Sequence, residues 1–185
     1  ISRRLYGVVF GVATQIVEEG VCSVEDVDRG AKVGLRWAMG PFELMNKIGV
    51  ANALEMALDY QEICDSFDEQ RSWKVPEFFV KQSNNWDFDY VDLEISDGVA
   101  TITINRPEAM NALNETVVSQ LGLAVDKVNS NPSVHTMVLD GAGKAFVAGA
   151  DVKFFVDKIR ANSIGDIVDF TTNGHRSLGC IGIIE

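Results

Sequence analysis

The spacing of apolar residues changes part-way along this chain, and this change constrains the fold more than any other feature. In residues 1–67 apolar side chains recur every three or four positions, as on one face of a helix. In residues 91–104 they alternate with polar side chains, as in a strand with one buried face. The sequence therefore predicts an all-α unit followed by a unit that contains a sheet.

Four helices are predicted in the first unit from this spacing and from their start and stop residues. Ser23 precedes two acids and suits an N-cap, while Pro41 suits the first turn of a helix. Glycines stand where the helices end, as is common after a last turn. The predicted helices run from about Arg3 to Glu19, from Ser23 to near Gly34, from Pro41 to Gly49 and from Ala51 to about Phe67.

A polar stretch with interspersed aromatic residues, 68–89, is predicted to link the two units. Pro76 permits a short helix that continues to about Gln82. Its aromatic side chains are expected to pack on a neighbouring unit, and an aromatic platform for a ligand is the alternative. The predicted domains are thus 1–67, the linker 68–89 and 90–185.

The second unit is predicted to begin with a β-hairpin. Asp97-Gly98 is a two-residue turn signal between two alternating runs, 91–95 and 99–104. Asn114 suits the N-cap of a helix that reaches about residue 128, and the apolar run 134–139 predicts a short buried strand. These elements make a ββα unit.

Two glycine-containing turns follow, and only one has the features of a binding site. The Gly-x-Gly of 141–143 lacks the third glycine of a dinucleotide fingerprint and the spacing of a phosphate-binding loop, so an ordinary turn is expected. In 147–151 small residues precede Asp151, which suits the N-cap of a helix over 152–159. Backbone N–H groups there could face an anion or an oxyanion, and a turn without a ligand is the alternative.

Composition restricts the remaining classes. With 27 acidic and 16 basic residues the net charge is −11, which argues against nonspecific nucleic-acid binding. No apolar run is long enough for a membrane span, and no metal-ligand cluster is evident. Cys22, Cys64 and Cys180 form no paired pattern, so a reducing cytoplasm is the expected compartment.

The first half resembles the C-terminal helical domain of the 3-hydroxyacyl-CoA dehydrogenase family. The resemblance rests on residues 19–28, on Gly40-Pro-Phe-Glu-Leu44 and on Ile48-Gly49. It implies a module for dimerisation and for covering acyl-CoA. The family's substrate-contacting Asn is replaced by Arg3 in the Arg3-Arg4 pair, and NAD is implied only through a Rossmann domain that this sequence does not contain.

The second half closely resembles the crotonase (enoyl-CoA hydratase) superfamily, through residues 99–113 and 144–151. The resemblance implies a truncated crotonase-like ββα domain and a coenzyme A thioester as substrate. The implied catalytic group is the backbone N–H of Ala150, as one of two oxyanion-hole donors. The residues implied to line the CoA thioester are Glu108, Ala109, Met110, Ala112, Ala148, Ala150, Asp151, Val152 and Lys153.

Together the two resemblances imply part of a bifunctional hydratase and dehydrogenase of fatty-acid β-oxidation or related CoA metabolism, whose catalytic acids lie beyond Glu185. A homo-oligomer is expected, with no nucleic-acid or membrane partner. The alternatives are a noncatalytic helical assembly module and a crotonase of other chemistry, such as an isomerase, hydrolase or decarboxylase. His135 and His175 are expected to be structural. The chain is predicted to be inactive alone, and to self-associate or be only partly ordered beyond about residue 160.

Overall fold

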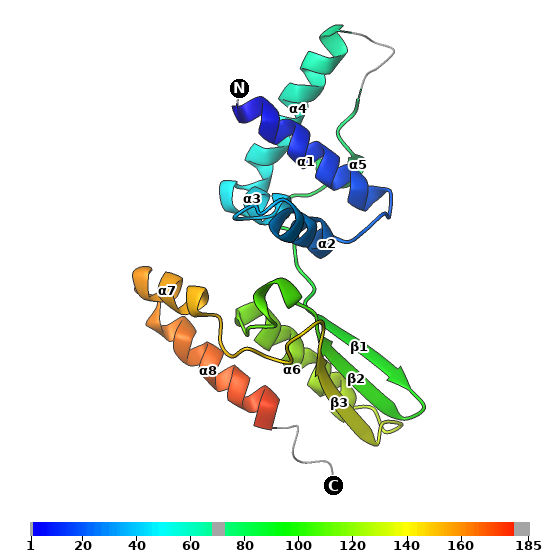
Figure 1. The fold of residues 1–185 in the computed structure, drawn as a ribbon, viewed down its shortest axis with the longest axis vertical. Helices are drawn as coiled ribbons and strands as arrows, with labels where there is room; N and C mark the ends of the chain where they lie inside the picture. Colours follow the sequence, from blue (N-terminus) through cyan, green and yellow to red (C-terminus); the bar gives the residue numbers. More distant parts are fainter. Residues whose placement is uncertain (1, 68–72, 180–185) are drawn as a thin grey trace. The chain divides into compact units, whose positions relative to one another are not determined.

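The computed structural model describes residues 2–67 and 73–179, and the chain divides into two compact units, Ile1–Phe88 and Asp89–Glu185 (Figure 1). The first unit is helical, and the second combines a three-stranded sheet with helices. The predicted α+β order, an all-α unit followed by a ββα unit, is confirmed. The division between the units falls inside the segment predicted as a linker.

The helices of the first unit begin and end within two residues of the predicted positions. They are α1 (Ser2–Glu18), α2 (Val24–Arg29), the π-helical η1 (Gly30–Gly34), α3 (Pro41–Ile48), α4 (Val50–Phe67) and the short α5 (Glu77–Val80). Ser23 is the predicted N-cap, because its hydroxyl accepts a hydrogen bond from the Asp26 N–H at 3.2 Å. The one difference is that the second predicted helix widens into a π-helix at Gly30.

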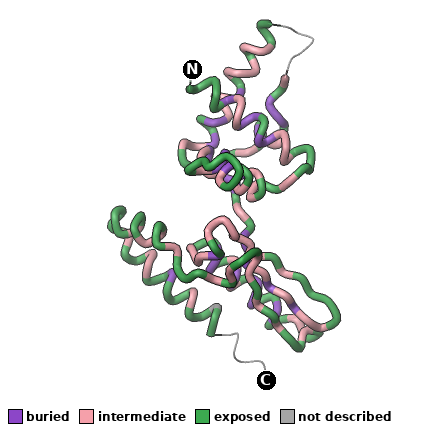
Figure 2. Tube along the Cα trace, viewed as in Figure 1, coloured by how far each residue is buried: buried purple, intermediate pink, exposed green. Residues whose placement is uncertain are grey.

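The core of the first unit forms where α1 crosses α4 and α3 packs beneath them. Phe10, Phe42 and Met45 are fully buried there. Figure 2 shows buried positions on the faces where these helices meet. The segment after residue 73 closes the same core, and the ring of Trp86 meets that of Phe42 edge-on at 5.0 Å between centroids. The aromatic side chains of the predicted linker are therefore packing residues of the first unit.

The sheet of the second unit has the order β1-β2-β3. Strands β1 (Val91–Ser96) and β2 (Val99–Ile104) pair antiparallel through the predicted turn, where Asp97 and Gly98 both have positive φ. Strand β3 (Thr136–Gly141) pairs parallel to β2. The buried face of β2 packs on α6 (Glu115–Asn129), which begins at the predicted N-cap Asn114.

Strand β3 differs from the prediction in position and in burial. It lies two residues later than expected, and its side chains alternate between exposed and half-buried, with Val138 44% exposed. The prediction of a buried strand is wrong because β3 is an edge strand within the described sheet, and α6 covers one sheet face only.

Two helices complete the described part of this unit, α7 (Val152–Arg160) and α8 (Ile164–Gly179). Helix α8 packs on both α6 and α7, and Phe170 is buried between them beside Phe154 and Phe155. A helix thus occupies residues 164–179, and partial order of the isolated chain beyond about residue 160 stays a prediction. Self-association of the chain stays a prediction.

Candidate functional site

The loop after β2 and the turn before α7 are joined by backbone hydrogen bonds, one of which runs from the Ala148 N–H to the Met110 carbonyl at 3.1 Å. The Leu113 N–H donates to the Gly149 carbonyl at 2.9 Å, and the Asp151 N–H donates to the Leu113 carbonyl at 2.8 Å. These two bonds make an isolated parallel bridge between Leu113 and Ala150. Two segments that lie more than thirty residues apart in the sequence are thereby held side by side.

This bridge determines the direction of the Ala150 N–H. In a parallel bridge the neighbours of one residue make both hydrogen bonds, so that residue's own N–H and C=O point to the opposite side. Ala150 is exposed, and among the described residues its N–H has no hydrogen-bond acceptor. Gly149 precedes it with a φ of +109°, a conformation suited to glycine. The turn therefore presents a backbone donor to the solvent.

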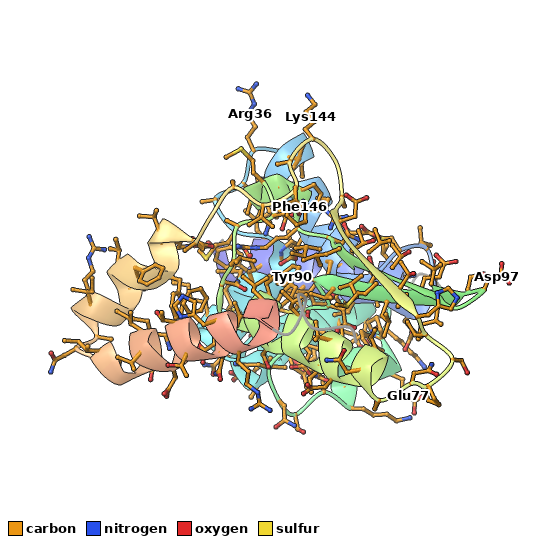
Figure 3. The ribbon with its side chains drawn as sticks, turned by 90° about the horizontal axis from the view of Figure 1, so that it is seen from below. Arg36, Glu77, Tyr90, Asp97, Lys144 and Phe146 are labelled. Carbon is orange, nitrogen blue, oxygen red and sulfur yellow. The ribbon has the colours of Figure 1, made fainter. Side chains whose placement is uncertain are left out.

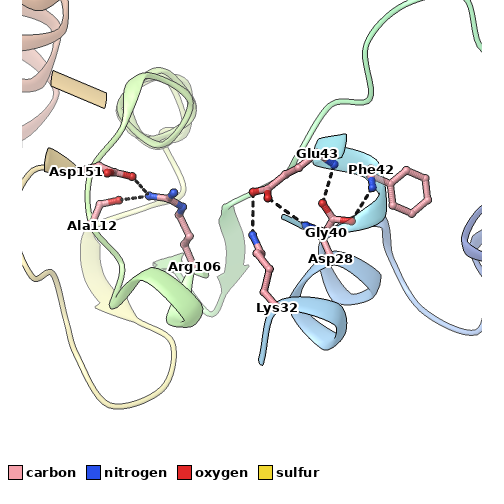
Figure 4. A network of polar contacts seen from close by, with 8 residues as sticks. All are labelled: Asp28, Lys32, Gly40, Phe42, Glu43, Arg106, Ala112 and Asp151. Carbon is pink, nitrogen blue, oxygen red and sulfur yellow. Dashed lines mark hydrogen bonds and ion pairs between the residues drawn. The ribbon is translucent and has the colours of Figure 1, made fainter. Parts of the chain in front are cut away.

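Arg106 fastens the two segments beside the bridge (Figure 4). Its Nη1 donates to the Ala112 carbonyl at 3.0 Å and to the Asp151 carboxylate at 2.8 Å. The two charged side chains are only 14% and 17% exposed, and the Tyr90 ring lies against the guanidinium with its centroid 5.6 Å from Cζ. A pair this well covered is screened little by salt.

Asn111 fastens the same loop to the turn at 141–146. Its side chain is completely buried and uses its amide fully, accepting from the Arg106 N–H at 2.8 Å and donating to the carbonyls of Ala142 at 3.0 Å and Ala145 at 2.7 Å. Met110 and Asn111 both have positive φ, and this conformation directs Met110 outward and the Asn111 amide inward.

Asp151 is the N-cap of α7, as predicted, and Arg106 controls its charge. Its Oδ1 accepts from the Lys153 N–H at 3.0 Å while its Oδ2 receives Arg106. Burial by itself would raise the pKa of Asp151, but the hydrogen bond and the charge of Arg106, with the N–H groups of Lys153 and Phe154, hold this pKa below its ordinary value. The carboxylate is therefore ionised and paired at neutral pH.

The predicted site residues fall into two groups by exposure. Met110, Ala148, Ala150, Val152 and Lys153 are exposed, and Met110 and Val152 are the most exposed apolar members at 62% and 72%. Glu108, Ala109, Ala112 and Asp151 are half-buried in the two segments. Lys144 extends from the tip of the neighbouring loop and Phe146 lies at its base (Figure 3). The bridge brings these segments together, and the roles of their residues stay predictions.

The residues present do not fit a dinucleotide. Gly141 ends β3 and the chain then turns, with the Ala142 and Ala145 carbonyls bonded to Asn111, whereas a pyrophosphate needs a helix that starts at the glycines.

His135 and His175 are both exposed and remote from the bridge in sequence, and Glu185 lies outside the described residues. Over residues 2–67 and 73–179, no cluster of His, Cys, Asp or Glu side chains is arranged to hold a metal ion. No helix in the same ranges is long and apolar enough to cross a membrane.

The first unit contains a comparable aspartate, Asp28, which is 1% exposed. Its Oδ1 accepts from the Phe42 N–H and its Oδ2 from the Glu43 N–H, both at 2.8 Å, so it caps α3 from another helix (Figure 4). Burial raises the pKa of Asp28 to about 6, although the two N–H groups lower it. Gly40 is required beside it, because a Cβ there would lie 2.1 Å from the Asp28 Cγ.

The sequence patterns gave no role to Asp28, Arg106 or Asn111. Each makes contacts that span 14 or more residues, and no local spacing rule reports such a contact. The only available signal was that a buried Asn or Asp in a loop must find partners, which becomes visible once burial is known.

An exposed backbone donor at the start of a helix, beside a loop that exposes Met110, is a geometry that suits an anion or a carbonyl oxygen that gains negative charge. Residues 99–178 match the family profile of enoyl-CoA hydratase/isomerase, and residues 1–83 match that of the 3-hydroxyacyl-CoA dehydrogenase C-terminal domain. The chain thus combines a region that matches the 3-hydroxyacyl-CoA dehydrogenase C-terminal domain with a region that matches the enoyl-CoA hydratase/isomerase family.

Individual relatives match the second half. A probable enoyl-CoA hydratase of Mycobacterium tuberculosis is 43% identical over 65 residues, which are 35% of this chain and 25% of that protein. A crotonyl-CoA hydratase of Syntrophomonas wolfei is 43% identical over 68 residues, 36% of this chain and 26% of that protein. The crystal structure of a probable enoyl-CoA hydratase/isomerase from Mycobacterium abscessus is 42% identical, with a TM-score of 0.37 over 38% of this chain and 28% of that one. The chain spans about a quarter of the length of the curated relatives it matches.

Proposed function

We propose that this chain is part of a bifunctional enoyl-CoA hydratase and 3-hydroxyacyl-CoA dehydrogenase that acts on acyl-CoA thioesters in fatty-acid β-oxidation or related CoA metabolism. One observation carries the proposal: the bridge between Leu113 and Ala150 directs an unused N–H outward beside the segment 108–112, in which Met110 is exposed. The two domain matches and the hydratases among the relatives support the choice of substrate.

The proposed reaction needs the Ala150 N–H when negative charge develops on the substrate. Adding water across an α,β double bond places negative charge on the thioester oxygen, and a fixed donor lowers the energy of that enolate. The Ala150 N–H is held by the backbone of its neighbours, so it requires no rearrangement when the charge develops. Loss of one such donor costs about 3 to 4 kcal/mol in the analogous acyl-transfer reactions.

The same segments are proposed to hold the rest of the thioester. The exposed side chains of Met110 and Val152 offer apolar surface on either side of Ala150, and Lys153 adds a positive charge at the start of α7. Glu108, Ala109, Ala112, Ala148 and Asp151 are proposed to complete the wall through their backbone. The family resemblance assigns the water-activating acids and the second donor to later sequence.

The dehydrogenase half is proposed to use NAD only through a Rossmann domain outside this sequence, because the Gly-x-Gly turn of this chain does not fit a dinucleotide. The reaction proposed for this half therefore involves no residue of the described chain in hydride transfer. The free thiols of Cys22 and Cys64 accord with a reducing cytoplasm, which we propose as the compartment.

Binding of crotonyl-CoA labelled with ¹³C at the thioester carbonyl tests the proposal. We expect the chain to shift the carbonyl resonance downfield, because a hydrogen bond to the oxygen polarises the C=O bond. Ala150→Pro removes the N–H without removing either bond of the bridge, and it should abolish the shift. Ile164→Pro is the matched control, since Ile164 is 61% exposed at the first position of α8, where an N–H has no partner within the helix. An unchanged shift in Ala150→Pro would rule out Ala150 as the donor.

A second candidate function, assembly through the helical unit, is favoured by an apolar groove between α1 and the residues that follow α2. Val12, Leu35 and Trp37 line this groove and remain 45%, 64% and 40% exposed. An exposed apolar surface of this kind commonly marks an interface. A second copy of the chain is the proposed occupant, giving a homo-oligomer.

The mass of the chain in solution tests the assembly proposal. Leu35→Glu should reduce a dimer to a monomer in light scattering, because a charge cannot be buried in an apolar interface without a partner. Val21→Glu is the control, since Val21 is equally exposed at 69% but lies outside the groove. Equal masses for the unsubstituted chain and Leu35→Glu would exclude this interface.

A further inference from the structure

We propose that Arg106 is a positioning residue for the thioester site, which holds the Ala150 N–H in place and neutralises the carboxylate beside it. The inference rests on the proposed function, and it adds a residue that the motif-based prediction left without a role. It is carried by three contacts of one guanidinium, with Ala112, Asp151 and the Tyr90 ring.

The first step of the inference is geometric. Ala112 precedes Leu113 in the bridge, and Asp151 follows Ala150 in it. The Nη1 of Arg106 donates to Ala112 at 3.0 Å and to Asp151 at 2.8 Å, and so it links the two segments on one side of the bridge. The opposite side of the bridge is where the Ala150 N–H points. Arg106 thus fixes the donor without touching the proposed substrate.

The second step is electrostatic. Asp151 carries a negative charge one residue from a donor that is proposed to stabilise another negative charge. An unpaired carboxylate so close in the chain would oppose the developing oxyanion, since two negative charges repel each other even near a protein surface. Arg106 cancels the charge while leaving Asp151 free to cap α7 with its other oxygen.

Other charged side chains lie in the same two segments and on α7. Lys153 is exposed on α7, and Glu108 lies in the short 3₁₀ helix of the first segment. Lys158 of α7 is paired with Glu115 of α6 and with Asp166 of α8. Arg106 is the charged side chain with the largest effect on Asp151. The Arg106 side chain is also only 14% exposed, so water cannot easily replace it.

The test measures the carbonyl resonance of ¹³C-labelled crotonyl-CoA bound to Arg106→Leu, as a function of pH. At neutral pH we expect at least half of the downfield shift to be lost. It should return as the pH is lowered and Asp151 takes up a proton, because a neutral Asp151 no longer opposes the oxyanion. A purely structural role for Arg106 would give a loss that does not depend on pH.

Three further variants complete the test. Arg106→Lys keeps the charge and should retain most of the shift at every pH, and Arg106→Gln repeats the pH series if Arg106→Leu does not fold. Arg29→Leu is the control, because it removes an arginine from an ion pair with Asp26 in the first unit. An unchanged shift in Arg106→Leu or Arg106→Gln would overturn the role of Arg106 alone. No shift in the unsubstituted chain would overturn the proposed function, and this role with it.

Discussion

Two aspartates in this chain receive the N–H groups of a helix start, yet their surroundings give them opposite acidities. Asp28 caps α3 from a separate helix, and its burial raises its pKa to about 6. Asp151 caps α7 from its own N-cap position, and Arg106 keeps its pKa below the ordinary value. The same backbone interaction therefore does not determine the charge of a carboxyl group. Deeper burial raises the pKa of Asp28, the contact with Arg106 lowers that of Asp151, and only the paired aspartate lies in the candidate site.

The largest effect is expected from a substitution that removes the cation paired with Asp151. Arg106→Leu should lower the free energy of unfolding of the second unit by about 4 kcal/mol at neutral pH, since it leaves a buried carboxylate unpaired. The loss should shrink in acid as Asp151 is protonated. Hydrogen exchange of the amides in residues 91–129 measures it. A loss below about 1 kcal/mol would show that the pair is solvated and that the contrast with Asp28 is weaker than the distances suggest.

The second effect is the pH dependence of the first unit. A carboxyl group whose pKa is raised on folding adds stability that is present below the pKa of the unfolded chain and is lost as the pH rises through the folded value. For Asp28 this window runs from about pH 4 to about pH 6, and the gain in acid is of the order of 3 kcal/mol. Trp37, Trp73 and Trp86 are the three tryptophans of the chain, and all belong to the first unit. Urea denaturation followed by their fluorescence therefore reports this unit alone.

Asp28→Asn is the reference for that experiment. It removes the titrating group, so the difference between the unsubstituted chain and the variant isolates Asp28 from the other acids. Stability that rises between pH 4 and pH 7 in this difference would contradict the raised pKa. The second unit should behave in the opposite way, because the stability from Asp151 is present above about pH 4 and is lost as the pH falls through its depressed pKa.

A third, smaller effect concerns residues 106–113, the loop that contains Arg106. Asn111→Ala removes three buried hydrogen bonds and should destabilise the second unit by about 2 kcal/mol. It should also raise the exchange rates of amides in residues 106–113 more than those of the sheet. Asn105→Ala is the matched control, as the Asn105 side chain bonds to Asp92 in an exposed contact. Equal effects of the two variants would remove Asn111 from the site's framework.

The smallest expected effect concerns Lys32. It tests whether this cation lowers the pKa of Asp28 as Arg106 lowers that of Asp151. Lys32 donates to Glu43 at 2.8 Å, and its charge lowers the pKa of Asp28. Lys32→Met should therefore raise that pKa further and cost about 0.5 kcal/mol at neutral pH. Carboxyl ¹³C chemical shifts measured against pH would show the change. A fall in the pKa of Asp28 would mean that Lys32 acts through the position of Glu43 rather than through its charge.

Much of the fold could be predicted because it depends on short-range rules. Alternation and the Asp97-Gly98 turn predict the hairpin, and Ser23, Asn114 and Asp151 were each expected to be N-caps before helical spacing began. The start and end of β3 could not be predicted well, since an apolar run does not indicate which of its residues pairs with which residue of β2.

The candidate site was only partly predictable for a related reason. The direction of the Ala150 N–H follows from a bridge to Leu113, and the pairing of Asp151 follows from a contact with Arg106 across 45 residues. Neither contact leaves a mark in local spacing. The family resemblance placed Ala150 in the site, but the residues that hold it there became visible only through burial and distance.

Gly149 has a φ of +109°, and this value sets the orientation of the peptide that carries the Ala150 N–H. Whether a residue adopts such a φ depends on the chirality of its Cα. A Cβ at Gly149 would meet no atom within 4 Å, so an L-alanine would fit in space. It is excluded only because an L-residue disfavours this backbone conformation, and relaxing that strain would rotate the peptide plane and turn the N–H away. Handedness at one open position thus decides where a hydrogen bond donor points, although nothing obstructs the position.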